Sequence, residues 1–247
     1  MGESIKRIVG PYQDSYSPNG IIGEKDACGV GFVANVEGIE SNWILKQSLK
    51  GLNCMEHRGG CGGDSDSGDG AGILCSIPWG YLEEKINLKN TQEFNRGLGM
   101  VFMPNKKEKI EICKSICDEE AEKLKVNKTS WRTVPVNNEI LGPLAKANAP
   151  FICQWILYID KKDHKDVERL LFQLRKRIEK KIRETFKNDV GDCEFYFASL
   201  SSQTVVYKGM VRSEILSEFY QDLKEESFKV SFSVYHRRFS TNTLPKW

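Results

Sequence analysis

The segment that most constrains this chain is Asp26-Ala27-Cys28-Gly29-Val30-Gly31-Phe32. Apolar residues alternate with small or polar ones here, and this period of two predicts a half-buried β-strand. The two glycines carry no side chain, so another group can approach the backbone just after the cysteine. The strand is expected to place on one face the apolar residues Val30, Phe32, Ala34 and Val36.

Cys28 allows two interpretations. A buried free cysteine commonly acts as a small hydrophobic core residue at the start of a strand. Cleavage between Ala27 and Cys28 would instead give the cysteine a free α-amine beside its thiol. An α-amine has a pKa of roughly 7.7–8.0 and a thiol one of roughly 8.5, so the amine can accept the thiol proton. Such a residue would be nucleophile and general base together.

The composition limits the protein classes that fit this chain. Its 247 residues with 40% hydrophobic side chains suffice for one large domain or two small ones. A net charge of only +2, from 36 basic and 34 acidic residues, argues against a dedicated nucleic-acid-binding protein.

Eight irregularly spaced cysteines indicate reduced thiols and a cytoplasm-like compartment, and leave an organelle open. No apolar run approaches the length of a membrane span. Residues 1–27 lack the apolar core of a signal peptide and form a short polar leader.

The hydrophobic pattern predicts alternating helices and strands. We expect a helix capped by Ser41 that ends within 56–60, strands over 73–77 and 98–103, a helix over 106–125, a central strand over 151–159, a helix over 163–186, a hairpin of strands 194–200 and 204–207, a helix over 213–224, and a strand over 230–235. This mixed order predicts an α+β fold in which helices pack outside sheets.

A second segment, Met55-Glu56-His57-Arg58-Gly59-Gly60 with the glycine- and aspartate-rich loop that runs to Gly72, is dense in special residues. It fits neither a phosphate-binding P-loop nor the dinucleotide fingerprint. Cys54, His57 and Cys61 have no evident fourth partner, so we expect no metal site. Arg58 is either a structural clamp on loop carbonyls or an active-site cation.

A third segment, His236-Arg237-Arg238-Phe239-Ser240-Thr241-Asn242-Thr243, leaves the end of the last expected strand. Strand ends that open into polar loops often hold ligands. The arginine fork can donate two parallel hydrogen bonds to a carboxylate. An ordinary polar exit loop is the alternative.

Together with Pro245-x-Trp247, these motifs resemble the N-terminal glutaminase domain of the glutamate synthases. These domains are class II glutamine amidotransferases of the N-terminal-nucleophile hydrolase type. The resemblance runs from about Cys28 to the last residue, with four motifs in the same order.

The resemblance implies a four-layer α/β/β/α sandwich that is C-terminally incomplete in this chain. Residues 1–27 would be a propeptide and residues 28–247 a partial amidotransferase domain. Cys28 would be the nucleophile, with Arg58 beside it. Arg238 would bind the α-carboxylate of glutamine, helped by the backbone from Phe239 to Thr241. The family is expected to carry an uncharged polar residue at position 237, so Arg237 and Arg238 both remain candidates for the carboxylate.

The implied reaction is hydrolysis of L-glutamine to glutamate and ammonia through a Cys28 thioester. The ammonia would pass to 2-oxoglutarate in downstream synthase domains of the same polypeptide. Those domains would use FMN, an iron–sulfur cluster and NAD(P)H or ferredoxin, and no cofactor, nucleic acid or membrane is expected for this chain. The family's oxyanion hole comes from a later Asn-Gly pair, so residues 28–247 alone are expected to be inactive. The alternatives are another class II amidotransferase, a Cys–His hydrolase that uses His57 or His236, or a catalytically silent fragment.

Overall fold

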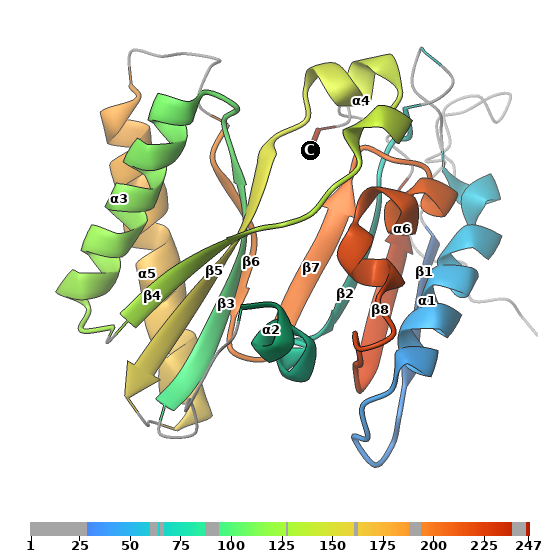
Figure 1. Cartoon of the computed structure of the whole chain (residues 1–247), viewed down its shortest axis with the longest axis horizontal. Helices are drawn as coiled ribbons and strands as arrows, with labels where there is room; N and C mark the ends of the chain where they lie inside the picture. Colours follow the sequence, from blue (N-terminus) through green and yellow to red (C-terminus); the bar gives the residue numbers. More distant parts are fainter. Residues whose placement is uncertain are drawn as a thin grey trace, which may run out of the picture.

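The computed structural model describes residues 29–59, 64, 67–86, 94–126, 128–160, 163–187, 194–238 and 246–247, with backbone only for Arg58 and Lys128. Eight strands in these ranges form two four-stranded antiparallel sheets, with helices packed on them (Figure 1). This mixed architecture is compatible with the expected α+β class. No helix among the described residues is long and apolar enough to span a membrane.

One sheet is built from residues 94–201 and has the strand order β4-β5-β3-β6. Its strands are β3 (Phe94–Met103), β4 (Lys128–Thr133), β5 (Phe151–Asp160) and β6 (Tyr196–Ser201). Helix α3 (Lys107–Lys123) follows β3, and helix α5 (His164–Thr185) follows β5. The β-α-β-β-α-β connectivity with this order is a split β-α-β arrangement.

Helices α3 and α5 cover one face of this sheet, and their apolar stripes explain why (Figure 1). Residues at helical spacing in α5 are fully or almost fully buried: Val167, Leu171, Leu174, Ile178 and Ile182. They contact inward-facing residues of β5, which has pairing partners on both sides. The predicted central strand and both predicted helices are therefore confirmed.

The other sheet has the strand order β1-β8-β2-β7. Its strands are β1 (Gly29–Ala34), β2 (Ala71–Ser76), β7 (Thr204–Gly209) and β8 (Phe232–Arg237). Helix α1 (Asn42–Cys54) packs on one face of it, and Ser41 caps that helix by accepting the Ile44 N–H at 3.4 Å.

The glycines of β1 allow the close approach that the sequence suggested. A Cβ at Gly31 would lie 2.5 Å from the Tyr235 ring, and a Cβ at Gly51 of α1 would lie 2.5 Å from the Tyr235 hydroxyl oxygen. The Tyr235 side chain therefore occupies the space that both glycines leave, which lets α1 lie close to the sheet.

In β1 and β8, the face that is buried is not the apolar face that the sequence predicted. Val30 and Phe32 are 66% and 75% exposed, whereas Ser233 of β8 is buried. The face that packs on α1 carries glycines and the Tyr235 ring instead of the apolar stripe, because only glycine leaves room for that ring.

The predicted hairpin of 194–200 and 204–207 is wrong, because β6 and β7 lie in different sheets. Glu168 of α5 accepts the N–H of Ser202 at 2.6 Å and the hydroxyl of Ser201 at 3.1 Å. These bonds hold the connection to α5 while the chain crosses to the other sheet.

Several short elements were missed or differ in type. Helix α2 (Trp79–Ile86), strand β4 and helix α4 (Pro143–Ala147) were not predicted. The expected helix over 213–224 is instead two 3₁₀ turns, η3 (Ser213–Ile215) and η4 (Gln221–Lys224), on either side of α6 (Leu216–Phe219). A further 3₁₀ turn, η2 (Asn138–Ile140), precedes α4, and η1 (Glu56–Arg58) follows α1.

Candidate active site

The five predicted site residues are only partly described. Cys28, Phe239 and Thr241 lie outside the described residues. Arg58 is the last residue of η1, with its backbone alone described. The Arg238 side chain is described and lines a pocket.

Strand pairing brings the three motif segments to one end of the β1-β8-β2-β7 sheet. Gly29, the residue after Cys28, pairs with Arg237, the residue before Arg238. The Arg238 N–H then donates to the Gly70 carbonyl at 2.9 Å, which joins the third segment to the glycine-rich loop. The described parts of the three motif segments therefore lie close together at this end of the sheet.

Arg237 is a fully buried arginine that links these segments. Its Nη2 donates to Glu56 Oε1 at 3.0 Å and its Nη1 to the Gly70 carbonyl at 3.1 Å. A Cβ at Gly59 would lie only 2.1 Å from the guanidinium, so glycine is needed there for the two groups to pack. Arg237 thus connects the turn that carries Arg58 with the glycine-rich loop.

Glu56 has further partners on this side of the sheet. Its Oε2 accepts the Ser213 N–H at 2.9 Å, and its Oε1 lies 3.6 Å from Arg212 Nε. Partial burial acts to raise the pKa of Glu56, but the Ser213 hydrogen bonds and the charges of Arg237 and Arg212 outweigh it and lower that pKa. The carboxylate therefore stays ionised and keeps Arg237 in place at neutral pH.

The glycine-rich loop is anchored separately to α4. The Asp64 carboxylate accepts the N–H of Ser67 at 2.8 Å and the N–H of Leu144, in the first turn of α4, also at 2.8 Å. The Ser67 hydroxyl donates to Asp64 and accepts the Ala145 N–H at 2.9 Å. Asp64 and Ser67 thus cap α4 in place of the glycine that precedes it.

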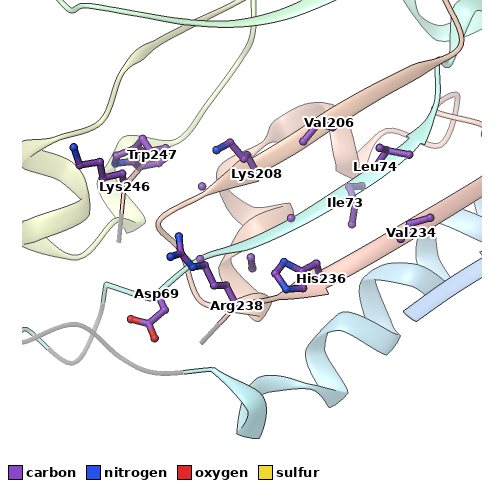
Figure 2. Close-up of a pocket in the computed structure, with 14 residues that line it drawn as sticks. Asp69, Ile73, Leu74, Val206, Lys208, Val234, His236, Arg238, Lys246 and Trp247 are labelled. Carbon is purple, nitrogen blue, oxygen red and sulfur yellow. The ribbon is translucent and has the colours of Figure 1, made fainter. Parts of the chain in front are cut away.

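A pocket of about 230 Å³ opens on the face of the sheet opposite α1 (Figure 2). Side chains from alternate positions of β2, β7 and β8 line it, as strand geometry requires. Its apolar part is formed by Leu74, Val206 and Val234, and its polar part by Asp69, Lys208, His236, Arg238 and Lys246. Trp247 closes one side, with its indole N–H donating to the Ala145 carbonyl at 3.0 Å.

Partial burial, and then the positive charge of Arg238, lowers the pKa of both His236 and Lys208. His236 is therefore neutral at pH 7, while the cations favour an anion. The arrangement suits a carboxylate in the polar part and an aliphatic chain over the apolar part.

Sequence reasoning missed Lys208 and the structural role of Arg237. The strand alternation contained a signal for both, because Lys208 follows the buried Tyr207 and Arg237 alternates with His236. No sequence pattern said which face of each strand would bear the pocket.

The sequence predicts no metal site at Cys54, His57 and Cys61. No cluster of three or more potential ligands from His, Cys, Asp and Glu occurs among the described residues. Cys61 lies outside them.

Comparison with known proteins identifies the class. The family of class-II glutamine amidotransferases matches residues 28–247, so the chain belongs to that family. Its relatives include ferredoxin-dependent glutamate synthases. The chloroplastic protein of Oryza sativa is 44% identical over 96% of this chain. The corresponding figures are 45% over 92% for glutamate synthase 2 of Synechocystis sp. and 42% over 100% for the protein of Pyropia yezoensis. The chain spans only 14–16% of the length of these relatives.

Proposed function

We propose that residues 28–247 belong to the glutaminase part of a glutamate synthase, which releases ammonia from L-glutamine. The match to the class-II glutamine amidotransferase family supports the amidotransferase activity. The relatives' names support glutamate synthase in particular, and they favour ferredoxin over NAD(P)H as the electron donor of the whole enzyme.

The observation that best supports the site is the pairing of Gly29 with Arg237. Cys28 is bonded to Gly29, and consecutive Cα atoms are about 3.8 Å apart, so the nucleophile belongs near Arg238 and its pocket. A carboxylate on Arg238 would fix one end of glutamine, while the side-chain amide extends toward the sulfur. Arg58 is the last residue of the turn η1, which Arg237 holds through Glu56, and the chain from Phe239 to Thr241 follows Arg238 in sequence.

In the proposed reaction, residues 1–27 are removed and the α-amine of Cys28 takes the thiol proton. The sulfur attacks the glutamine amide carbon, so a C–S bond forms and the C–N bond breaks. The α-ammonium returns its proton to the leaving NH2 group, which departs as ammonia. Water then cleaves the thioester to glutamate and restores the thiol. The start of the family match at Cys28 agrees with such a boundary.

The remainder of the reaction belongs to parts of the polypeptide outside this chain. Ammonia would aminate 2-oxoglutarate there, with FMN and an iron–sulfur cluster supplying the electrons. We assign no residue of this chain to either cofactor.

We also propose the four-layer α/β/β/α sandwich as the fold of the complete domain. Helices α3 and α5 form one outer layer on their sheet, and α1 packs on a face of the other sheet. The layer order is supported by this packing.

The direct test is Cys28→Ala in the full-length enzyme. Glutamine-dependent glutamate formation should fall by at least about 10³-fold, because the nucleophile is lost. Ammonia-dependent synthesis should continue, because it takes place at a separate site. Cys54→Ala, which changes an exposed cysteine of α1, is the matched control and should retain both activities. Wild-type glutaminase activity in Cys28→Ala would overturn the proposal.

A Cys–His hydrolase is the alternative that uses the same pocket. Its base would be His236, because His236 lines the pocket. Such an enzyme needs no cleavage before Cys28. N-terminal sequencing of active full-length protein separates the two, since activity with Met1 intact would favour the histidine.

A further inference from the structure

Lys208 is a partly buried lysine that lies close to two aromatic rings. Its Nζ lies 4.4 Å from the centroid of the Tyr196 ring and 5.8 Å from that of Phe102. Burial and the positive charge of Arg238 lower the pKa of Lys208, and no acidic group among the described residues acts to raise it. Buried lysines are ordinarily paired, so this arrangement calls for an anion from elsewhere.

Lys208 of β7 and Arg238, the residue that follows β8, line the same pocket (Figure 2), and β2, the strand between β7 and β8, has glycine at position 72. Gly72 of β2 pairs with Lys208 on one side and with His236 on the other. A Cβ at Gly72 would lie 2.9 Å from the Lys208 Cβ. Gly70, whose carbonyl accepts the Arg238 N–H, has no side chain either, so the surface between Lys208 and Arg238 is left open at both positions.

The charge of the pocket favours an anion even when Asp69 is counted. Three cationic side chains, Lys208, Arg238 and Lys246, share the lining with one acidic side chain, which leaves a net charge of about +2. Lys208 and Arg238 repel each other, and this repulsion contributes to the lowered pKa of Lys208. A carboxylate between them would relieve the repulsion and restore charge balance.

We propose that Lys208 is a second cationic contact for the substrate α-carboxylate that Arg238 binds. This proposal rests on the glutaminase function above. Arg238 would supply directional hydrogen bonds to the carboxylate. The ammonium of Lys208 would supply a point charge from the other side of β2. Lys208 is thus a determinant of specificity for free α-amino acids over substrates that lack this carboxylate.

The test compares two substrates in the full-length enzyme. L-Glutamine has the α-carboxylate, whereas L-glutamine α-amide has an uncharged amide in its place. Lys208→Met should raise the KM for glutamine about tenfold and leave kcat within about twofold, because the lost contact is made equally in the bound ground state and the transition state. The kcat/KM for the α-amide should not change. Lys208→Arg should recover most of the loss, because it keeps the charge.

Lys229→Met is the matched control, because Lys229 is exposed and lies outside the pocket. Its KM for both substrates should match the wild type. An equal loss of kcat/KM for glutamine and the α-amide in Lys208→Met would overturn the proposal, since Lys208 would then act only on the structure. An unchanged KM for glutamine would overturn it as well.

Calorimetric binding of L-glutamine to Cys28→Ala separates this proposal from the proposed function. Adding Lys208→Met to this variant should weaken glutamine binding about tenfold. If Lys208→Met weakens glutamine binding in this way but the wild-type enzyme does not hydrolyse glutamine, the glutaminase function is contradicted. The contact between Lys208 and the carboxylate is then still supported.

Discussion

Arg237 and Arg238 are adjacent in sequence, but their side chains lie on opposite faces of one sheet. Alternation along β8 turns Arg237 toward α1 and η1, where Glu56 and Gly70 accept its hydrogen bonds. Arg238 follows on the pocket side. The choice between the two arginines, which sequence reasoning left open, therefore has a geometric basis that favours Arg238 for the substrate.

This difference predicts opposite phenotypes. Arg237→Met should lower the free energy of unfolding by about 1.5–3 kcal/mol, because it removes a charged hydrogen bond to Glu56 and another to the Gly70 carbonyl. Arg238→Met should mainly weaken glutamine binding, by about 2–4 kcal/mol, because it removes a charge-assisted contact. Urea unfolding and the KM for glutamine in the full-length enzyme measure the two effects. An unchanged KM in Arg238→Met would place the carboxylate elsewhere.

Gly70 has a backbone conformation that other residues rarely adopt, with φ at +141°. Gly70→Ala should therefore destabilise the protein by about 1–3 kcal/mol. Gly80→Ala is the matched control, because Gly80 lies in helix α2 with open space around a Cβ. It should stabilise the protein by about 0.5–1 kcal/mol. Equal effects of the two substitutions in urea unfolding would contradict this account.

At the scale of the elements, the long periodic segments were predictable and the short ones were not. Apolar residues recur every 3.6 residues in α3 and α5, and β5 has a continuous apolar run. Such long patterns fit only one type of secondary structure when the apolar side chains are buried. Strand β4, in contrast, has polar residues at most positions and is held by its pairing with β5. Such pairing depends on distant sequence and has no local signal.

The same reasoning explains the error at β6 and β7. Two strands separated by a short turn usually pair, but the Glu168 hydrogen bonds to Ser201 and Ser202 come from another element. For the site, local motifs indicated the segments that converge. Which face of each strand lines the pocket depends on tertiary packing. For this reason Lys208 was not predicted as a site residue.

The anchor between the glycine-rich loop and α4 predicts a dependence on pH. Hydrogen bonds from Leu144 and Ser67 lower the pKa of Asp64 from 3.8 to about 2. A carboxyl whose folded-state pKa is lowered contributes stability above its unfolded pKa, and this contribution is lost as the pH falls toward about 2. Asp64→Asn should therefore show a smaller drop in Tm between about pH 5 and pH 2.5 than the wild type.

Circular dichroism at the two pH values measures this difference. Asp163→Asn is the control, because Asp163 makes no side-chain cap bond to the helix that follows it. If Tm falls as much in Asp64→Asn as in the wild type, the Asp64 anchor contributes nothing to the pH dependence of stability.

At the scale of the whole molecule, a buried polar network joins the two sheets. Arg132 of β4 forms a two-pronged ion pair with Asp222 of η4, with both distances 2.8 Å. Asp222 also accepts hydrogen bonds from Tyr81 of α2 at 2.7 Å and from Tyr207 of β7 at 3.1 Å. Because Tyr207 precedes Lys208, this network also fixes the strand that carries one wall of the pocket.

Removing one partner of this network should destabilise the whole fold. Asp222→Asn is expected to lower the free energy of unfolding by about 3–5 kcal/mol, because it leaves the Arg132 charge buried without compensation. Asp166→Asn, in an exposed pair with Arg169, should change it by less than about 1 kcal/mol. Urea unfolding gives both values. A loss in Asp222→Asn no larger than that in Asp166→Asn would mean that the network does not hold the sheets together.

The central claim is that Cys28, freed at its amine, is the nucleophile of a glutamine site beside Arg238. The most direct measurement is mass spectrometry of the full-length enzyme after treatment with a glutamine analogue that carries an electrophilic diazoketone in place of its amide. The account predicts one adduct, on a Cys28 that is the N-terminal residue, with labelling blocked by excess glutamine and abolished in Arg238→Met at low analogue concentration. An adduct on another cysteine, or labelling of Cys28 with residues 1–27 still attached, would contradict it.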